Sequence, residues 1–386
     1  MRPSWETHLD DWIAGGVVDA AMAERVRAFE ASRGEHQKLR WPILLALAFG
    51  GLLVFAGILL VIAAHWDGIS PAMRFVLVLL LVAGFHVGGV AAADRFPALA
   101  TVLHALGTGA LGGGIYLAGQ IFNMQGDWPA ALLLWAVGAW TGWILLRDWP
   151  QAAFAALLTP AWLIGKWSDS TSHMQDAQRI VGAGLLLLAI SYLTTRTTGP
   201  ATAARRALVA IGAIALLPCA FTAIDLAHTE TYYGAIHFRS MPGFLLVLGW
   251  SAAYGLPLLL AWWARGRAAW INVVAALWVW ALVTVSENGV WGSSARTGSD
   301  LGVYSLCALG SVALVLWGLY ERHKIRLNLG VAGFAVTVLM FYFSDVMSKL
   351  DRASSLIGLG ILFLLGGYLL ERARRNLVAR MSGGAA

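Results

Sequence analysis

Residues 72–93 read AMRFVLVLLLVAGFHVGGVAAA, and Arg74 is the single charged residue in this stretch. A helix needs about 20 apolar residues to cross the hydrocarbon core of a bilayer, so the stretch predicts a transmembrane helix. Backbone polar groups in lipid must be satisfied within their own segment, which favours a helix over a strand. The chain returns to polar sequence at Asp94-Arg95, and another long apolar run follows.

The composition of the whole chain points the same way. Of 386 residues, 59% are hydrophobic and 12% are charged, with a mean hydropathy of +0.70. A soluble domain carries about 25% charged residues, so the composition excludes an ordinary soluble protein. The pI near 9.5 reflects basic residues in short clusters between apolar runs, which is typical of membrane orientation, and no nucleic-acid partner is expected. Cys219 and Cys307 lack metal-ligand spacing, so neither a disulfide framework nor a metal site is expected.

Apolar runs recur along the chain and predict an all-α fold, a polytopic integral membrane bundle of about 12 transmembrane helices. The predicted spans are 43–64, 72–93, 98–122, 129–147, 150–166, 180–195, 206–224, 242–264, 268–287, 301–320, 327–344 and 354–371. The fifth and sixth runs are short, and whether they cross the membrane fully is left open.

Lys and Arg are distributed unevenly between the two sides of this topology. Of the 27 basic residues, twenty fall on one side and seven on the other. The seven are Arg74, Lys166, Arg179, Arg239, Arg296, Lys349 and Arg352. Because cytoplasmic loops carry an excess of Lys and Arg, this distribution places both termini in the cytoplasm. The abundance of Arg, Ala and Gly indicates a bacterial source, so the expected location is the bacterial inner membrane.

The predicted domains are a cytoplasmic amphipathic helical hairpin over 1–42, a transmembrane domain over 43–372 and a basic cytoplasmic tail over 373–386. The first hairpin helix ends at Gly15-Gly16, and Asp19 is expected to cap the second. Their apolar stripes consist of Leu9, Trp12 and Ile13, and of Met22, Val26 and Phe29. The hairpin is expected to pack on the cytoplasmic membrane face or on another copy of the chain, to dock a partner, or to serve as a leader that sets orientation. The first span is expected to act as an uncleaved anchor.

Glycine and proline interrupt several spans. The pairs Gly84/Gly88 and Gly109/Gly113 have the GxxxG spacing that lets helices approach closely. The alternative for the Gly-rich stretch 107–114 is a locally unwound helix that lines a cavity. Three prolines are expected to kink their helices or to leave a carbonyl without its hydrogen bond: Pro160, Pro218 and Pro257.

Polar residues at the outer ends of the spans form the candidate ligand-binding set. Gln120 and Asn123 lie one helical turn apart, and amides at that depth need partners from another helix or a bound solute. Asp127 precedes Trp128-Pro129 and is a candidate cap for the fourth span. The remaining candidates are Trp66, Asp67, Asp225, Glu287 and Asp345. The amides with Trp66 and Asp67 are expected to form a pocket for a small solute or to join helix ends together. Asp225, Glu287 and Asp345 are candidates for a cation-attracting vestibule on the outer face, and the alternative is that they only anchor loops.

Two histidines lie within the membrane, His86 in the second span and His104 in the third. In antiparallel neighbouring helices both rings lie at a similar depth, where they could form a proton relay. The alternative is that each ring hydrogen-bonds a backbone carbonyl or a threonine. Two histidines without a third ligand do not predict a metal site.

Several of these motifs resemble the bacterial predicted membrane proteins grouped as domain of unknown function family 2157. The similar segments are Ala63-Ala64-His65-Trp66-Asp67 before a Ser-Pro helix start, Gly119-Gln120 with Asn123, Gly126-Asp127-Trp128, Leu134-Trp135, the Trp12 to Gly15-Gly16 hairpin, and Asp345, Leu350, Ser354-Ser355, Gly358, Gly360 and Leu369-Leu370-Glu371-Arg372. The resemblance covers about residues 5–150 and, more weakly, 320–376. His65 stands where the family pattern has Asn. The resemblance implies a membrane architecture and no particular activity.

No phosphate-binding loop, zinc-protease motif or nucleophile elbow occurs in the sequence, so an enzyme is not expected and no cofactor is predicted. The expected partners are the lipid bilayer, a small-molecule or lipid ligand, and either another copy of the chain or a cytoplasmic protein. Two hypotheses follow. The protein binds or transports a small solute or lipid through the outer polar cluster, or it is a non-transporting scaffold or sensor whose hairpin docks a partner.

Overall fold

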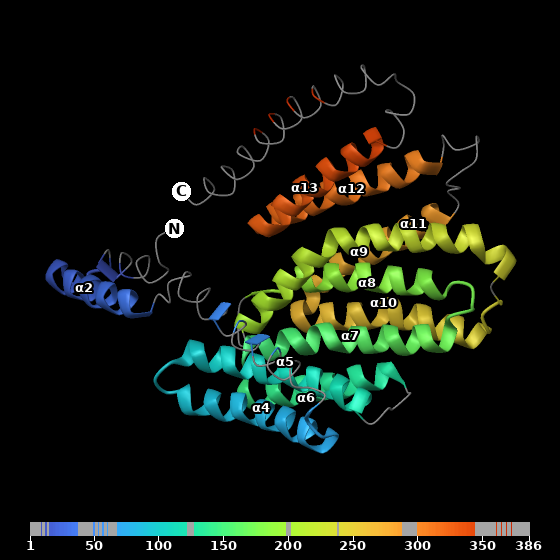
Figure 1. Ribbon diagram of the computed structural model, residues 1–386. Coiled ribbons are helices and arrows are strands. Elements are labelled where there is room, and N and C mark those ends of the chain that lie inside the picture. The colour runs from blue at the N-terminus through green and yellow to red at the C-terminus, as the bar shows by residue number, and fades with distance from the viewer. Residues whose placement is uncertain are drawn as a thin grey trace. The chain divides into compact units, whose positions relative to one another are not determined.

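The structure, a computed structural model, describes residues 15–37, 68–121, 127–197, 202–237, 239–287 and 299–343, with isolated positions at 9, 12, 13, 49, 50, 53, 56, 57, 60, 360, 364, 368 and 372. The regular elements in these residues are all helices, so the predicted all-helical class is confirmed (Figure 1). The chain forms two compact units, Met1–Met124 and Gln125–Ala386.

The described helices of the first unit are α2 (Ala20–Gln37), α4 (Pro71–Ala92) and α5 (Pro97–Ile121). The start of α2 is set by Asp19, whose Oδ1 accepts a hydrogen bond of 2.6 Å from the Met22 backbone N–H, as predicted. At α4, Ser70 is the N-cap, and its Oγ lies 3.4 Å from the Met73 nitrogen. The remainder of the predicted N-terminal hairpin falls largely outside the described residues.

Helices α4 and α5 pack as an antiparallel pair through glycines that face histidines. A Cβ added to Gly89 would lie 2.6 Å from the His104 ring, and one added to Gly107 would lie 2.7 Å from the His86 ring. The approach therefore depends on these two glycines having no side chain. At three glycines of the predicted GxxxG pairs, Gly84, Gly109 and Gly113, an added Cβ would have no described atom within 4 Å, so their close packing stays a prediction.

The second unit contains α6 (Trp128–Leu146), α7 (Trp149–Thr171), α8 (Ala177–Leu193), α9 (Thr202–His237), α10 (Gly243–Arg265), the short 3-10 helix η2 (Gly266–Ala269), α11 (Trp270–Glu287), α12 (Ser299–Tyr320) and α13 (Lys324–Phe341). Helices α10 and α11 are joined by η2, where Gly266 has a φ of +59°. Glycine adopts this left-handed conformation without steric cost, and it ends α10 there.

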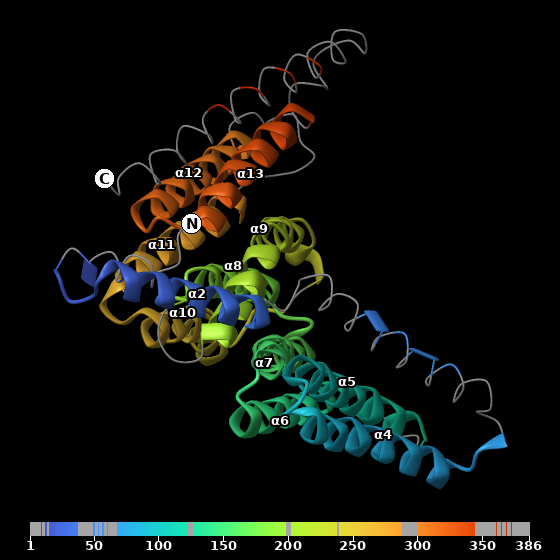
Figure 2. The same cartoon turned by 90° about the vertical axis from the view of Figure 1, so that its left-hand side faces the viewer.

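Helix α8 lies among α7, α9, α10 and α11 (Figures 1 and 2). Small residues bring its neighbours close, since an added Cβ on Gly212 of α9 would lie 2.3 Å from the Leu193 nitrogen, and one on Gly184 of α8 would lie 3.3 Å from Ala253 of α10. The sequence ranked the run 180–195 among its two shortest spans. A helix enclosed by protein on most sides does not need the length of one that faces lipid.

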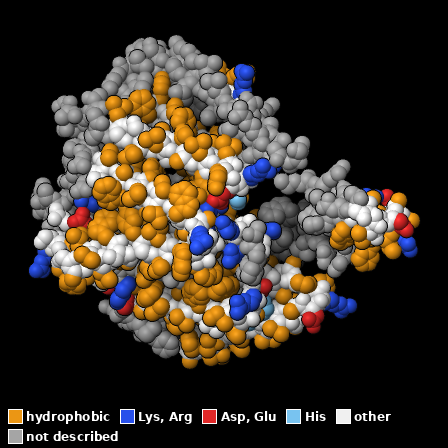
Figure 3. Space-filling model, turned by 180° about the vertical axis from the view of Figure 1, so that it is seen from behind, with side chains coloured by type: hydrophobic (Ala, Val, Ile, Leu, Met, Phe, Trp, Pro, Cys, Tyr) orange, Lys and Arg blue, Asp and Glu red, His pale blue; other side chains and the backbone are white. Residues whose placement is uncertain are grey.

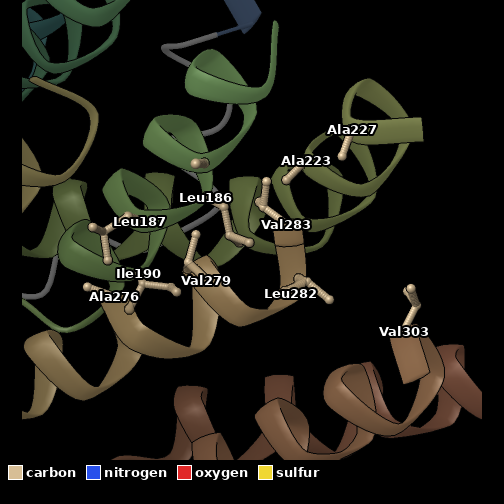
Figure 4. Packing of buried hydrophobic residues seen from close by; sticks show 11 residues of the cluster. Leu186, Leu187, Ile190, Ala223, Ala227, Ala276, Val279, Leu282, Val283 and Val303 are labelled. Atoms are coloured by element: carbon tan, nitrogen blue, oxygen red, sulfur yellow. The ribbon is translucent and has the colours of Figure 1, made fainter. Parts of the chain in front are cut away.

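The largest apolar core of the described residues lies where α8 meets α9 and α11 (Figure 4). Leu186, Leu187 and Ile190 of α8 lie beside Ala276 and Val279 of α11 (Figure 4). Both Leu186 and Val279 are fully buried. Each buried aliphatic side chain of this kind loses about 2–5 kcal/mol of stability on truncation to Ala, so this core holds the unit together.

Seven described stretches are long and apolar enough to span a bilayer: Pro71–Ala92, Pro97–Gln120, Trp128–Leu146, Thr202–Ala227, Gly243–Ser286, Leu301–Tyr320 and Lys324–Phe341. The stretch Gly243–Ser286 contains two predicted spans, and the predicted spans 43–64 and 354–371 lie outside the described residues except at isolated positions. Apolar side chains cover most of the described surface seen in Figure 3, as expected for helices that face lipid.

Candidate functional site

Half of the predicted ligand-binding residues lie outside the described part of the chain. These are Trp66, Asp67, Asn123 and Asp345. Glu287 is the last residue of α11, and its side chain is also outside the described atoms. The structure therefore places three of the predicted side chains, on different elements: Gln120, Asp127 and Asp225.

The three described candidates have local partners or exposed positions. In the first unit, Gln120 Nε2 donates a hydrogen bond of 3.0 Å to the Tyr116 hydroxyl, one turn away on α5. In the second unit, Asp225 is exposed on α9. Asp127 is the N-cap residue of α6, as predicted, but its side chain makes no cap hydrogen bond. Its Oδ2 instead accepts a hydrogen bond of 2.7 Å from Lys166 Nζ on α7.

The Lys166 ammonium lowers the pKa of the Asp127 carboxyl, chiefly through this hydrogen bond. The pair joins the start of α6 to the far end of α7. Both side chains are about half exposed, so the pair is screened by solvent and contributes little to stability.

The two histidines of the first unit face each other. Their Nδ1 atoms lie 3.2 Å apart, and the ring centroids are 5.5 Å apart. At this distance one Nδ1 donates a hydrogen bond and the other accepts it, so the tautomer of one ring determines the tautomer of the other. His104 is 4% exposed, and the Thr108 hydroxyl donates to its carbonyl oxygen at 3.2 Å. A proton relay through the pair remains a prediction.

A large groove runs through the second unit between helices α6 to α10. Its volume is about 960 Å³, and its lining is almost wholly apolar. Ligand pockets typically measure about 300–1,000 Å³, so the groove is at the upper end of that range. We define the α6–α10 groove by five of its lining residues, one from each helix: Trp143, Thr159, Leu188, Arg205 and Ala252.

One wall of the groove contains a proline and the hydrogen bond that compensates for it. Pro160 has no backbone N–H, so the carbonyl of Ala156, four residues earlier in α7, loses its helical partner. The Tyr192 hydroxyl of α8 donates to this carbonyl at 2.7 Å. All three residues line the groove. Pro160 thus leaves a carbonyl of α7 without its helical hydrogen bond, as predicted, and a hydroxyl from α8 replaces that bond. Helix α7 itself continues through the proline.

The two ends of the groove differ in charge balance. At one end lies Lys166, which is paired with Asp127. At the other end lie Arg147, at the C-terminus of α6, and Arg205, in the first turn of α9. Among the described residues that line the groove there is no Asp or Glu.

The arginine end also has hydrogen-bond donors without acceptors among the described residues. The buried Trp143 Nε1 and the buried Arg205 Nε have no partner there. The Arg205 guanidinium lies 5.6 Å from the Trp263 ring centroid, and Arg147 lies 5.9 Å from that of Trp143. Arg205 Nη1 donates to the carbonyls of Arg196 at 3.3 Å and Ala264 at 3.4 Å. These contacts hold the two arginines at one end of the groove. We call Trp143, Arg147 and Arg205 the groove's basic end.

Beside the basic end, a buried ionic cluster consists of Arg265, Glu321 and Arg326. Both arginines form ion pairs with Glu321, and they are 3% and 1% exposed. Trp317 Nε1 donates a further hydrogen bond of 2.8 Å to Glu321. The two guanidinium groups lie 5.1 and 5.6 Å from the Trp317 ring centroid. Charge, hydrogen-bond and cation–π contacts are therefore combined in one cluster.

The ionic cluster also completes the end of α8. Arg265 Nη1 and Arg326 Nη2 both donate to the Thr194 carbonyl, the latter at 3.2 Å. Asn272 Nδ2 donates to the Thr194 hydroxyl at 2.9 Å. The last carbonyls of a helix lack intrahelical partners and carry partial negative charge, which these cations neutralise. The cluster thus ties the C-termini of α8, α10 and α12 to the N-termini of α11 and α13.

Titration of the ionic cluster is set by the same contacts. Burial by itself raises the pKa of Glu321, but hydrogen bonds from Arg265, Trp317 and Arg326 outweigh it and lower the pKa to about 2. Burial lowers the pKa of His323, and the Arg326 guanidinium lowers it further. Glu321 is therefore a carboxylate, and His323 is neutral, near neutral pH.

The sequence predicted neither the groove nor the ionic cluster. The positive-inside rule assigns the arginines of both sites to cytoplasmic loops. Glu321 belongs to no recognisable motif. One sequence signal could have predicted the ionic cluster. Trp317, Glu321 and Arg326 flank one short turn between two helices, so an aromatic ring, an acid and a base lie close together there.

The family model described as predicted membrane protein (DUF2157) matches residues 10–152. This confirms the resemblance over the N-terminal part of the chain, and the similarity expected over 320–376 remains a prediction. No curated protein and no solved structure matches the chain. The family description supports a membrane protein and assigns no activity, so function has to be argued from the residues of the groove and its surroundings.

Proposed function

We propose that this membrane protein binds a lipid or lipid-like amphiphile in the α6–α10 groove. The observation that carries the proposal is a groove of about 960 Å³ whose lining is almost wholly apolar and ends in cations. A hydrophilic solute or ion would lose its hydration in such a place without replacement hydrogen bonds. An acyl chain loses nothing, and the apolar area that it buries favours binding by about 25 cal/mol per Å².

The prolines of the groove support exchange of its ligand. Pro160 of α7 and Pro257 of α10 both line the groove, and each deprives its helix of one backbone hydrogen bond. Helices weakened in this way bend more easily than continuous ones. The two walls can then separate enough for an acyl chain to enter from the bilayer.

The proposed location is the bacterial inner membrane, with both termini and the arginine-rich loops in the cytoplasm. The basic residues that support this orientation include Arg147, Arg205 and Arg265, which lie at one end of the second unit. In this orientation the basic end of the groove faces the cytoplasmic leaflet. A reporter fused in the connection between α8 and α9, ahead of Thr202, should respond as a cytoplasmic one.

A groove-filling variant tests the proposed function. Ala252 lines the groove and is not covered by other side chains, so Ala252→Trp occupies groove volume without burying a clash in the core. The full chain is purified, delipidated and titrated with a long-chain phosphatidylglycerol, and bound lipid is counted by native mass spectrometry. We expect Ala252→Trp to weaken binding about tenfold or more, which corresponds to about 1.4 kcal/mol.

The matched control is Val247→Trp, because Val247 lies on the same helix, is 66% exposed and does not line the groove. This variant should bind lipid as the unmodified chain does. Equal binding by Ala252→Trp and Val247→Trp would show that lipid associates with the outside of the helices and would refute the proposed function.

The second candidate function is a scaffold or sensor that acts through its N-terminal helices. Met22 of α2 is 47% exposed, although the sequence assigns it to an apolar stripe. Such a stripe is available to a cytoplasmic partner or to another copy of the chain. Deletion of residues 1–38 should then abolish the cellular phenotype while lipid binding in the groove is unchanged. If the phenotype survives the deletion, the scaffold hypothesis fails.

A further inference from the structure

We propose that the basic end of the α6–α10 groove binds the phosphate headgroup of an anionic phospholipid, whose acyl chains occupy the apolar part of the groove. This inference deepens the proposed function and rests on it. It adds the chemical class of the ligand, the direction in which the ligand lies, and the residues that select it.

The first argument is the pair of unsatisfied donors. Trp143 Nε1 and Arg205 Nε are both buried, and neither has an acceptor among the described residues. A buried donor without an acceptor costs about 1–3 kcal/mol, so native structures rarely leave one unpaired. Both residues line the groove, so a side-chain rotation that turns these donors toward an acceptor oxygen of a ligand at this end would remove the cost. A phosphate group has several such oxygens.

The second argument is the charge of the lining. Arg147, Lys166 and Arg205 line the groove, and the described lining contains no acid. Lys166 already has a carboxylate partner, Asp127, at 2.7 Å. The two arginines have aromatic rings and, for Arg205, carbonyl oxygens as neighbours. An anion therefore complements the arginine end and not the lysine end, which fixes the direction of an amphiphile in the groove.

The third argument is that the basic end is prearranged. Arg147 has a left-handed backbone conformation (φ 57°) and ends α6 through a hydrogen bond of 3.0 Å from its N–H to the Trp143 carbonyl. Arg205 lies in the first turn of α9, where the helix dipole is positive. Its Nη1 is fixed by the Ala264 carbonyl of α10, so the guanidinium group is held at this end of the groove by a side chain that is already ordered. Little rotamer entropy is lost when an anion binds there.

The test compares two lipids with the same acyl chains and different charge. The purified, delipidated full chain is titrated with phosphatidylglycerol and with phosphatidylcholine, and bound lipid is counted by native mass spectrometry. We expect about tenfold tighter binding of phosphatidylglycerol, and we expect this preference to shrink as salt increases. Inorganic phosphate alone should compete weakly, because it lacks the chains that fill the groove.

Two variants locate the preference. Arg205→Gln should weaken phosphatidylglycerol binding about tenfold and leave phosphatidylcholine binding nearly unchanged, because it removes the charge and the Nε donor. Trp143→Phe retains an aromatic ring and removes only the Nε1 donor, and it should weaken binding of phosphatidylglycerol about threefold to tenfold. The matched controls are Arg267→Gln and Trp262→Phe, since both residues are exposed near the same helix end and neither lines the groove.

The outcomes separate this inference from the proposed function. If neither lipid binds, or if Ala252→Trp has no effect, the proposed function fails. If both lipids bind equally tightly and Ala252→Trp weakens both, the groove holds lipid but the headgroup inference is overturned. A preference for phosphatidylglycerol that persists unchanged in both Arg205→Gln and Trp143→Phe also overturns it. If Arg205→Gln does not fold, Trp143→Phe decides.

Discussion

Two groups of arginines lie side by side in the second unit, since Arg205 contacts the carbonyl of Ala264 and the next residue, Arg265, belongs to the ionic cluster. They differ in what surrounds the guanidinium groups. In the ionic cluster, an acid, a tryptophan and helix carbonyls accept or face the donors. At the basic end of the groove, no acid is present among the described lining residues.

This difference in surroundings distinguishes the arginines of the ionic cluster, which have a structural role, from those of the groove, for which we propose a ligand-binding role. Arg265 and Arg326 are more deeply buried than Arg205, and a charge at that depth persists only when it is paired. The ionic cluster provides that pairing internally. The described lining of the groove's basic end contains no carboxylate, and in the proposal above an external anion takes that place. Arg265 Nε and Arg205 Nε are both buried without an acceptor among the described residues, so what distinguishes the two groups is the carboxylate of Glu321 beside one of them.

The largest expected effect comes from breaking the ionic cluster. Glu321→Gln removes the carboxylate charge and leaves two buried guanidinium groups facing each other. Removal of one partner of a buried ion pair costs about 3–5 kcal/mol, and because Gln retains one acceptor we expect about 3 kcal/mol. Thermal unfolding of the purified protein should show a drop of several degrees in Tm. The control is Glu24→Gln, an exposed glutamate paired with Arg27 on α2. Equal Tm values for the two variants would contradict the structural role of the cluster.

The pH dependence of stability provides the next largest effect. The pKa of Glu321 is about 2 in the folded protein, against an ordinary value of 4.5. A carboxyl with a lowered folded pKa contributes stability that is present above its unfolded pKa and lost as pH falls toward its folded pKa. We expect roughly 2 kcal/mol of this contribution to be lost by about pH 3. The stability gap between the unmodified chain and Glu321→Gln should shrink by the same amount over that pH range. A gap that is constant with pH would contradict the assignment.

A single hydroxyl in the groove wall should have an intermediate effect. Tyr192→Phe leaves the Ala156 carbonyl, already without a helical partner because of Pro160, with no hydrogen-bond donor. We expect a loss of roughly 1–2 kcal/mol in stability, measured by thermal unfolding. The control is Tyr116→Phe, because Tyr116 is 67% exposed. A Tm for Tyr192→Phe no lower than that for Tyr116→Phe would show that water or lipid satisfies the carbonyl instead.

The sequence predicted the parts of this fold that depend on local signals. The spans that became α4, α5, α6, α9 and α12 have apolar lengths that follow from bilayer thickness alone. Likewise, Asp19 was identified as a cap because capping depends on a residue and its next turn. The position of α8 among four neighbours was not predictable, since it depends on which helices pack together and not on the apolar content of the run.

The candidate sites were even harder to predict from local sequence than the packing of the helices. Arg147, Arg205 and Arg265 are among the twenty basic residues that positive-inside reasoning assigns to the cytoplasmic side, with no difference between them. What distinguishes them is whether a carboxylate from a distant segment, Glu321, lies within reach. That depends on packing between α10 and α12, which no local pattern encodes. By contrast, the facing of His86 and His104 followed from their similar depth on adjacent antiparallel helices.

The smallest effect on stability is expected at an exposed charged pair of the second unit, Asp127 with Lys166. Asp127→Asn should leave Tm unchanged within error, because both partners are about half exposed and solvent screens the pair. The same variant tests the outer-face hypothesis made from the sequence. If Asp127 binds a solute, transport or binding falls while abundance is retained; the exposed Asp94→Asn is the matched control. If neither function nor stability changes, Asp127 serves only as the partner of Lys166. The lysine end of the groove then has a charge balance that is complete within the protein, and the contrast with its arginine end becomes sharper.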